Sequence, residues 1–348
     1  MLKNLKSCLK KLKTTPVIYI NPTDAANKHS LDKQKPLTEQ ENWDELGKSV
    51  LSTIIFKSFR ERLSGSDWES TDLYKWRKRK GRNLAKFTYW DSMLNDIVEN
   101  GYSFKSLKRD PIGEYMSILI GCYGHMFIYN GIHRFCSCLL SKKPGKIPVK
   151  VLYRHPEWED FKTKCSKYKQ QLYCQLPHPD LKQIPFKWTN ERADLIAENS
   201  LYPNGTLVDI GAHWGTISYT LAQKGFNVLA VENSLAPYKF LERISKFPGK
   251  PFSITKSNFT NMKINADTLS MLNIAHHFII DKDRHKKFIQ FLNNLNVKEI
   301  FYQAHGIKSK WTKHIDPLAF LGLIISETKM TKAKELKTFD ERTLYHLT

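Results

Sequence analysis

Two acidic residues and two glycines stand at set intervals in the segment TLVDIGAHWGTISYTLAQKGFNVLAVE, residues 206–232. Asp209 comes first, Gly211 and Gly215 follow it, and Glu232 closes the segment. Glycines let a ligand approach the backbone closely. A helix that begins after the second glycine offers unpaired N–H groups, and a carboxylate accepts hydrogen bonds from hydroxyls. The spacing therefore predicts a binding site for a nucleoside-like ligand.

The elements that must position these residues are a strand, a glycine turn, a helix and a second strand. Leu207, Val208 and Ile210 form a short apolar run, which is typical of a buried parallel strand. Apolar residues then recur at helical spacing over 216–224, and residues 227–231 form a second apolar strand. This order of elements is the first half of a nucleotide-binding βαβ unit.

The turn discriminates between two classes of cofactor. A dinucleotide site uses the spacing G-x-G-x-x-G, whereas residues 209–215 read D-I-G-A-H-W-G, so His213 stands where a pyrophosphate needs bare backbone. The segment resembles motif I of the class I S-adenosylmethionine-dependent methyltransferases. The resemblance implies that Asp209 and Gly211 face the methionine and ribose parts of S-adenosyl-L-methionine, and that Glu232 binds the ribose hydroxyls. The alternative is a Rossmann-like unit that binds no ligand.

The resemblance extends beyond Glu232 to a third strand. Residues 252–255 read as this strand. In the family, an acid or amide after the third strand contacts the adenine ring. Asn258 is the nearest match for that role, and Ser257 is the alternative.

A pair of histidines follows the expected fourth strand. Residues 267–274 read as this strand and lead into His276 and His277, in a turn that resembles one the family often carries on the side of the methyl group. A histidine at the carboxyl end of a strand is well placed to act as a general base for a hydroxyl acceptor. The alternative is that both imidazoles only shape the pocket. His305, after a fifth strand, is a weaker candidate.

A second group of polar residues lies in the N-terminal half of the chain. Two apolar segments, 115–119 and 125–129, read as a strand pair. The sequence N-G-x-H-R and a short helix come directly after this pair. Residues 146–152 read as a third strand. This layout resembles the ParB/sulfiredoxin-like fold, as it occurs in proteins associated with surface-glycan biosynthesis. The resemblance covers about residues 15–160.

In that fold a D-G-x-H-R turn opens a helix at a nucleotide or phosphate site. The resemblance implies an anion- or nucleotide-binding site at Asn130, Gly131, His133 and Arg134, with Asn130 in place of the acid. An arginine fork and an imidazole at a helix N-terminus suit an anion. The alternative is that Arg134 makes a structural ion pair, for example with Glu114, and that His133 packs under the sheet.

The length of 348 residues favours two domains. We expect an α/β protein with a C-terminal Rossmann-like, doubly wound methyltransferase sheet, preceded by a smaller α+β ParB-like domain. The expected ranges are a basic amphipathic segment at 1–14, the ParB-like domain at 15–165, a linker at 166–190 and the methyltransferase domain at 191–348.

The chain is strongly basic, with a net charge of +21. This charge favours polyanionic partners such as nucleic acid, an anionic membrane surface or phosphorylated sugars. A general bias toward lysine explains the charge equally well. Residues 1–13 form an amphipathic pattern that allows weak peripheral membrane contact, and the segment WRKRKGR at 76–82 is a further basic cluster.

The cysteines and the hydropathy pattern predict the compartment. None of the six cysteines forms a C-x-x-C pair, so we expect no metal site and a reducing environment. No apolar run is long enough for a transmembrane helix, and no secretory leader is recognisable. These features predict a cytoplasmic protein.

The acceptor of the methyl group has to be inferred by exclusion. Residues 273–276 read N-I-A-H, which lacks the N/D-P-P-Y/F turn of N6-adenine methylases, and no cysteine lies beyond Cys174 to serve a C5-cytosine enzyme. We therefore expect O-methylation of a sugar, a glycan or another small-molecule hydroxyl. The alternative is a nucleic-acid-associated protein, either an RNA methyltransferase or a ParB-like nucleotide or nucleic-acid binder with a degenerate methyltransferase domain.

Overall fold

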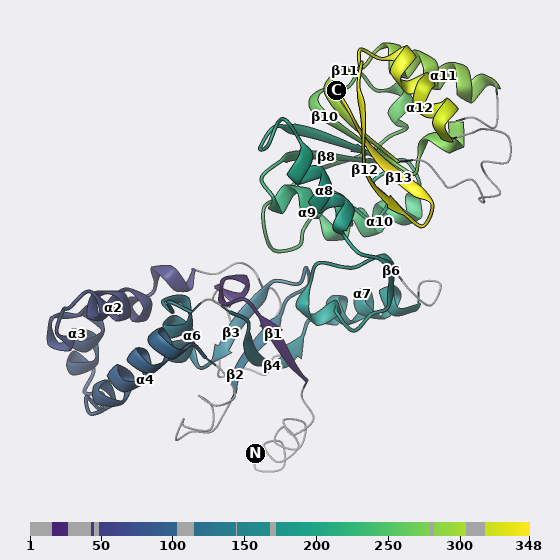
Figure 1. The fold of residues 1–348 in the computed structure, drawn as a ribbon. Coiled ribbons are helices and arrows are strands. Elements are labelled where there is room, and N and C mark those ends of the chain that lie inside the picture. Colours follow the sequence, from purple (N-terminus) through teal and green to yellow (C-terminus); the bar gives the residue numbers. More distant parts are fainter. Residues whose placement is uncertain are drawn as a thin grey trace. The chain divides into compact units, whose positions relative to one another are not determined.

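The computed structural model divides the chain into two compact units (Figure 1). The N-terminal unit comprises residues 1–167 with 178–181, and the C-terminal unit comprises 168–177 with 182–348. The structure describes residues 16–26, 43–44, 49–102, 115–143, 145–167, 172–278, 282–303 and 317–348. The expected segment 1–14, Glu114 and His305 lie outside the described residues.

A four-stranded sheet forms the centre of the N-terminal unit. Its order is β1-β4-β2-β3, in which β2 pairs parallel with β4 and antiparallel with β3, while β1 pairs antiparallel with β4. All five residues of β2 are buried, as its continuous apolar sequence requires. The strands are β1 (Val17–Ile20), β2 (Met116–Ile120), β3 (Met126–Asn130) and β4 (Ile147–Arg154).

Several helices of the N-terminal unit begin at side-chain caps. Thr53 accepts a hydrogen bond from the Phe56 amide at the start of α2, and Thr71 accepts one from the Tyr74 amide at the start of α3. The helices are η1 (Pro22–Ala25), η3 (Val50–Ser52), α2 (Ile54–Leu63), η4 (Trp68–Ser70), α3 (Asp72–Arg79), α4 (Lys86–Asn100), α6 (Ile132–Leu139), α7 (Pro156–Lys167) and η5 (Pro179–Leu181).

The predicted strand pair, third strand and short helix are present as β2, β3, β4 and α6. Two helix starts differ from the sequence pattern. Trp43, where a helical pattern begins, lies in a turn, and the described helix starts at Ile54 behind its Thr53 cap. The helix expected from Trp90 starts earlier, at Lys86, because Phe87 and Trp90 both belong to its buried face.

A seven-stranded sheet forms the centre of the C-terminal unit. Its order is β12-β13-β11-β10-β7-β8-β9. β7 to β11 pair in parallel, whereas β13 runs antiparallel between β11 and β12. The strands are β7 (Thr206–Ile210), β8 (Asn227–Glu232), β9 (Ser253–Lys256), β10 (Asn265–Leu272), β11 (Asn296–Gln303), β12 (Ala333–Phe339) and β13 (Arg342–Leu347).

Helices cover both faces of this sheet (Figure 1). Residues of α8 and α9 pack in one apolar cluster, and residues of α11 and α12 pack in a second, larger one. The helices are α8 (Glu191–Asn199), α9 (Thr216–Gln223), α10 (Leu235–Ile244), η6 (Phe259–Asn261), η7 (Ala275–Phe278), α11 (Lys282–Asn293) and α12 (Pro317–Glu327). The predicted fold class, α/β with a Rossmann-like, doubly wound C-terminal sheet preceded by an α+β unit, is confirmed. The ParB-like identity of the N-terminal unit stays a prediction.

The range that we predicted as a linker, 166–190, contains regular structure. β5 (Leu172–Cys174) and β6 (Phe186–Trp188) pair in parallel, and η5 lies between them in sequence. β5 and β6 belong to the C-terminal unit, whereas residues 178–181 belong to the N-terminal unit. None of the helices that the structure describes is both long and apolar enough to cross a membrane.

Candidate functional site

A hollow lies at the carboxyl ends of β7 and β10, where the strand order of the C-terminal sheet reverses. Open α/β sheets bind ligands at this position. The hollow encloses about 550 Å³ of space between atoms, part of it open to solvent. Its walls are formed by Cys174, Arg192, Asp209, Gly211, Ala212, His213, Trp214, Thr216, Ile217, Leu272 and Asn273.

The glycine turn between β7 and α9 depends on its two glycines. Gly211 and Gly215 have φ values of +69° and +76°, which side chains rarely adopt. A Cβ at Gly211 would lie 2.9 Å from the side chain of Ile274, and one at Gly215 would lie 2.3 Å from Leu241. Both glycines are therefore needed for the turn, and Gly211 itself lines the hollow.

Asp209 lies at the wall of the hollow, 3% exposed. Its Oδ2 accepts a hydrogen bond of 2.5 Å from the Ser218 hydroxyl. The pKa of Asp209 is raised to about 6, mainly by burial and also by the nearby Glu232 carboxylate, against the hydrogen bond from Ser218. A positive group in the hollow would stabilise the ionised form.

Glu232 ends β8 but is not among the residues that line the hollow. Its Oε2 accepts a hydrogen bond from the His213 amide at 2.9 Å, and its Oε1 accepts one from the Ser234 amide at 2.7 Å. These bonds fix the carboxylate beside the glycine turn. Each oxygen keeps a further lone pair, so the carboxylate can still accept hydrogen bonds from ligand hydroxyls.

His213 adopts a left-handed backbone conformation, with φ +54°, and lines the hollow. The next residue, Trp214, is buried and stacks on Phe240 of α10 at 3.8 Å between ring centroids. His213, which we expected to occupy the position that a pyrophosphate needs, therefore forms part of the wall of the hollow.

Several residues that line the hollow were not predicted from the sequence, among them Arg192, Cys174 and Asn273. Arg192 of α8 is 4% exposed, and its Nε donates a hydrogen bond of 2.7 Å to Gln303 Oε1. Cys174 of β5 is buried, and burial raises the pKa of its thiol to about 11, against a hydrogen bond with Thr216. The residues that line the hollow thus include both a guanidinium group, from Arg192, and a carboxyl group, from Asp209.

The remaining predicted residues of this unit do not line the hollow. Asn258 Oδ1 accepts hydrogen bonds from the Thr260 amide and hydroxyl, so it caps η6. His276 and His277 form η7 after β10, with ring centroids 4.0 Å apart. His276 is 4% exposed. His277 lies at the surface, where partial burial and Arg284 lower its pKa, against the carboxylate of Glu232.

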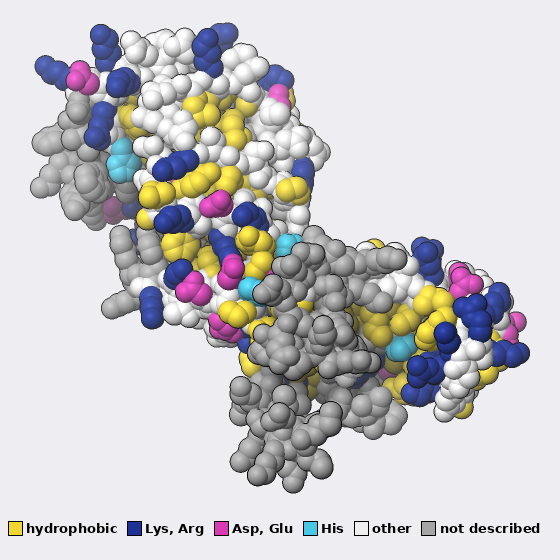
Figure 2. All heavy atoms as spheres, turned by 180° about the vertical axis from the view of Figure 1, so that it is seen from behind, with side chains coloured by type: hydrophobic (Ala, Val, Ile, Leu, Met, Phe, Trp, Pro, Cys, Tyr) yellow, Lys and Arg dark blue, Asp and Glu magenta, His cyan; other side chains and the backbone are white. Residues whose placement is uncertain are grey.

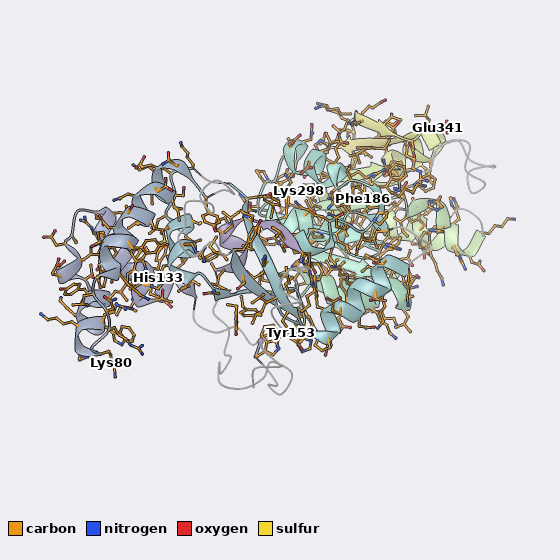
Figure 3. The ribbon with its side chains drawn as sticks, turned by 90° about the horizontal axis from the view of Figure 1, so that it is seen from below. Lys80, His133, Tyr153, Phe186, Lys298 and Glu341 are labelled. Atoms are coloured by element: carbon orange, nitrogen blue, oxygen red, sulfur yellow. The ribbon has the colours of Figure 1, made fainter. Side chains whose placement is uncertain are left out.

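The second group of predicted residues surrounds the start of α6 in the N-terminal unit. His133, which is labelled in Figure 3, stacks on Trp90 of α4, with ring centroids 4.1 Å apart. The pKa of His133 is lowered to about 4, mainly by burial and also by the positive charges of Arg77, Lys86 and Arg134. The imidazole is therefore neutral at pH 7 and lies in a region of positive potential.

Asn130 and Gly131 form the turn before this helix. Asn130 Oδ1 accepts a hydrogen bond of 2.8 Å from the Gly131 amide, and Gly131 has φ +85°. A Cβ at Gly131 would lie 2.7 Å from Met116 Cγ. Arg134 is 6% exposed, and Arg77 lies over the Trp90 ring at 5.0 Å. Arg77 belongs to the basic cluster predicted at 76–82, whereas Lys86 was not predicted. The closeness of both to the motif could not be predicted, because they lie about 50 residues before it.

Comparison with solved structures finds methyltransferases at low sequence identity. WbdD, described as a bifunctional kinase-methyltransferase, matches at 17% identity and a TM-score of 0.45, over 54% of this chain and 46% of that chain. Magnesium protoporphyrin IX methyltransferase from Synechocystis PCC 6803, with bound SAM, matches at 14% identity and a TM-score of 0.37, over 45% of this chain and 78% of that one.

A glycopeptide N-methyltransferase, MtfA, matches at 9% identity and a TM-score of 0.37, over 46% of this chain and 89% of that one. The present chain covers about half the length of WbdD. No family model matches the sequence, and no curated protein matches it. Within the described residues, no group of three or more His, Cys, Asp or Glu side chains is arranged to hold a metal ion.

Proposed function

We propose that the C-terminal unit is an S-adenosyl-L-methionine-dependent methyltransferase that O-methylates a sugar, a glycan or another small-molecule hydroxyl. One observation carries the proposal: the hollow at the reversal of strand order has the glycine turn of motif I as one wall and holds Arg192 and Asp209 together. A cation and a carboxyl group in one hollow complement the amino-acid end of the methyl donor.

The residues present fit this cofactor better than they fit a dinucleotide. Gly211 opens the backbone to a ligand, whereas His213 fills the position that a pyrophosphate would need. Glu232 is fixed beside the turn by two backbone amides and keeps lone pairs for ribose hydroxyls. Asn258 follows β9 and remains our candidate for the adenine contact, although its Oδ1 already accepts hydrogen bonds from Thr260.

The donor supplies an activated methyl group on a sulfonium, so the protein has mainly to align an acceptor with it. Alignment can contribute about 7–11 kcal/mol to catalysis. Asp209 and Arg192 would orient the donor, and Trp214 and Leu272 would exclude water from part of the hollow. A general base adds typically 10²–10⁴-fold. His276 and His277 remain our candidates for this role, since they follow the carboxyl end of β10.

The proposed acceptor class rests on the resemblance of the N-terminal unit to modules associated with surface glycans. In this unit, Asn130 and Gly131 form the turn on which the resemblance rests, and α6 follows that turn directly. We propose that this unit has the ParB-like fold and serves the same process as the methyltransferase unit.

Calorimetric titration of the full chain with S-adenosyl-L-methionine tests the proposed cofactor. We expect Glu232→Ala to weaken binding about tenfold or more, because it removes a charged acceptor for the ribose. Glu242→Ala, at an exposed position of α10, is the matched control and should leave affinity unchanged. Failure of the wild-type chain to bind the cofactor would refute the proposal.

A second candidate function is anion, nucleotide or nucleic-acid binding by the N-terminal unit. The observation that favours it is the convergence of Arg77, Lys86 and Arg134 on His133. Dark-blue side chains also gather over the end of this unit that carries α3 (Figure 2). Cations that share one neighbour repel each other, and a bound phosphate would relieve that repulsion.

Binding of ATP and of single-stranded RNA of random sequence, each at two salt concentrations, tests this candidate. We expect Lys86→Ala to weaken binding about three- to tenfold, whereas Lys164→Ala, an exposed control that pairs with Asp160, should not. A steep salt dependence with RNA alone would identify a nucleic-acid binder. Binding of neither ligand by the wild-type chain would exclude the candidate.

A further inference from the structure

Two residues that line the hollow have a strained backbone conformation. Among the described residues, five that are not glycine have positive φ values. Asn204 precedes β7, and Asp340 with Glu341 forms the turn between β12 and β13 (Figure 3). The other two, His213 and Asn273, both line the hollow. Such conformations persist where the surrounding structure enforces them, often at functional sites.

Asn273 is held in this conformation by Gln303, which ends β11 and is fully buried. The backbone N–H of Asn273 donates a hydrogen bond of 2.8 Å to the backbone carbonyl oxygen of Gln303. The Asn273 side chain donates a second one, from Nδ2 to Gln303 Oε1, at 2.9 Å. Asn273 is therefore held at two points, once through its backbone and once through its side chain, and the side chain cannot rotate without losing its hydrogen bond to Gln303.

The orientation of the Gln303 amide is fixed by its other contacts. Its Oε1 also accepts a hydrogen bond from Arg192 Nε at 2.7 Å, and its Nε2 donates one to the Arg342 carbonyl oxygen at 3.0 Å. If the Gln303 amide were flipped, its NH2 group would face the Arg192 N–H donor, and its oxygen would face the Arg342 carbonyl oxygen. These contacts therefore determine which atom of the amide is oxygen and which is nitrogen. Asn273 must then present Nδ2 to Gln303.

The Asn273 Oδ1 atom is consequently directed away from Gln303. It is buried, and no donor of the described residues reaches it. A buried acceptor without a donor is destabilising. A hydrogen-bond donor brought into the hollow by a ligand would satisfy it, and the Asp209 carboxyl group in the same wall favours a positively charged donor.

We propose that Asn273 contacts the cofactor, accepting a hydrogen bond through Oδ1 from the α-ammonium group of S-adenosyl-L-methionine, and that Gln303 is the residue that positions it. The assignment rests on the proposed methyltransferase function. Gln303 also holds Arg192, so one buried amide orients an acceptor for the ammonium group and a cation for the carboxylate. This network selects a ligand with a zwitterionic amino-acid end.

Two ligands separate this role from a general effect on folding. S-adenosyl-L-methionine carries the amino-acid end, whereas 5′-methylthioadenosine keeps the nucleoside and thioether but lacks that end. For the full chain, we expect Asn273→Gly to weaken the affinity for S-adenosyl-L-methionine about ten- to a hundredfold and to leave the affinity for methylthioadenosine unchanged, in calorimetric titrations. Glycine accepts the positive φ without strain.

Asn204→Gly is the matched control, since it makes the same substitution at a positive φ outside the hollow. It should change neither affinity. Gln303→Met should reproduce the selective loss of affinity for S-adenosyl-L-methionine. Gln303→Glu loses the donor to the Arg342 carbonyl oxygen but keeps the acceptor for Arg192 and Asn273, so it should retain most of that affinity.

The outcomes separate this assignment from the proposed function. If the wild-type chain binds neither ligand, both are overturned. If it binds S-adenosyl-L-methionine and Asn273→Gly binds it equally well, or loses both ligands equally, the assignment to Asn273 is overturned and the methyltransferase proposal stands. If Asn273→Gly fails to fold, the contrast between Gln303→Met and Gln303→Glu decides.

Discussion

Asp209 is a carboxyl group whose ionisation the fold opposes. Its pKa is raised from 3.8 to about 6, first by burial. Between these pH values the folded state binds more protons than the unfolded state, so this group lowers stability as pH rises through that window. The difference corresponds to roughly 3 kcal/mol above pH 6, at about 1.4 kcal/mol for each pH unit.

We expect Asp209→Asn to stabilise the protein by roughly 2–3 kcal/mol at pH 7–8 and to have little effect at pH 4. The same substitution should weaken the binding of a positively charged ligand. Urea unfolding at several pH values measures the first effect, and calorimetry measures the second. Asp267 is a control of opposite sign: Lys298 and Thr206 lower its pKa to about 2, so Asp267→Asn should destabilise the protein at pH 7. Equal pH dependence of wild type and Asp209→Asn would contradict the prediction.

The residues of the glycine turn could be predicted from sequence because their spacing alone carries the information. Gly211 is needed for a positive φ, and His213 stands within the same seven residues. Arg192 and Cys174 could not be predicted in this way. They reach the hollow from α8 and β5, and only the folded chain brings these elements to the carboxyl ends of β7 and β10.

At the level of elements, Glu299 of β11 ties together three parts of the C-terminal unit. It is fully buried, and its carboxylate accepts hydrogen bonds from Ser200 after α8, from Thr268 of β10 and from His346 of β13. Burial alone would raise the pKa of Glu299, but these hydrogen bonds and one from the Leu201 amide hold it below its ordinary value of 4.5.

We expect Glu299→Leu to destabilise the C-terminal unit by about 3–5 kcal/mol at pH 7, because it leaves four donors, two of them buried, without their acceptor. The lowered pKa means that this stabilisation is present above pH 4.5 and is lost as pH falls through the folded-state value. The difference between wild type and variant in urea unfolding should therefore shrink in acid. Glu335→Leu, at an exposed position of β12, is the control and should be nearly neutral.

The strands with continuous apolar sequence could be predicted to within a few residues, as β7, β8, β10 and β11 show. β12 has no such pattern. Its residues, AKELKTF, are mostly exposed, because it is an edge strand that pairs only with β13. β5 and β6 have three residues each and pair only with one another, so their sequences are too short to show a period.

On the scale of the whole molecule, the chain passes between its two units three times, at about residues 167, 178 and 182. The short return to the N-terminal unit, residues 178–181, is held by Asp180. Its carboxylate accepts hydrogen bonds from Arg154 at 2.6 and 2.8 Å and from Trp158 Nε1 at 2.9 Å. A sequence pattern cannot reveal such a crossing, because four residues with one charge carry no periodicity.

This path determines where the C-terminal unit can be separated. A fragment of residues 168–348 keeps Cys174 at the hollow and Trp188, whose ring lies 4.8 Å from the Arg192 guanidinium. A fragment of residues 191–348, the range expected from sequence, lacks both. We expect the longer fragment to bind S-adenosyl-L-methionine with the affinity of the full chain, and the shorter one to bind it at least tenfold more weakly, because Arg192 loses its contact with the Trp188 ring.

Calorimetry and thermal unfolding of both fragments measure these differences. His178→Asn in the longer fragment is the control, since His178 belongs to the N-terminal unit, where its Nε2 contacts the Gly124 carbonyl oxygen at 2.9 Å. That substitution should destabilise the full chain and leave the fragment unaffected. Equal affinity of the two fragments would show that β5 and β6 are dispensable for the site, and that the boundary near residue 190 is the functional one.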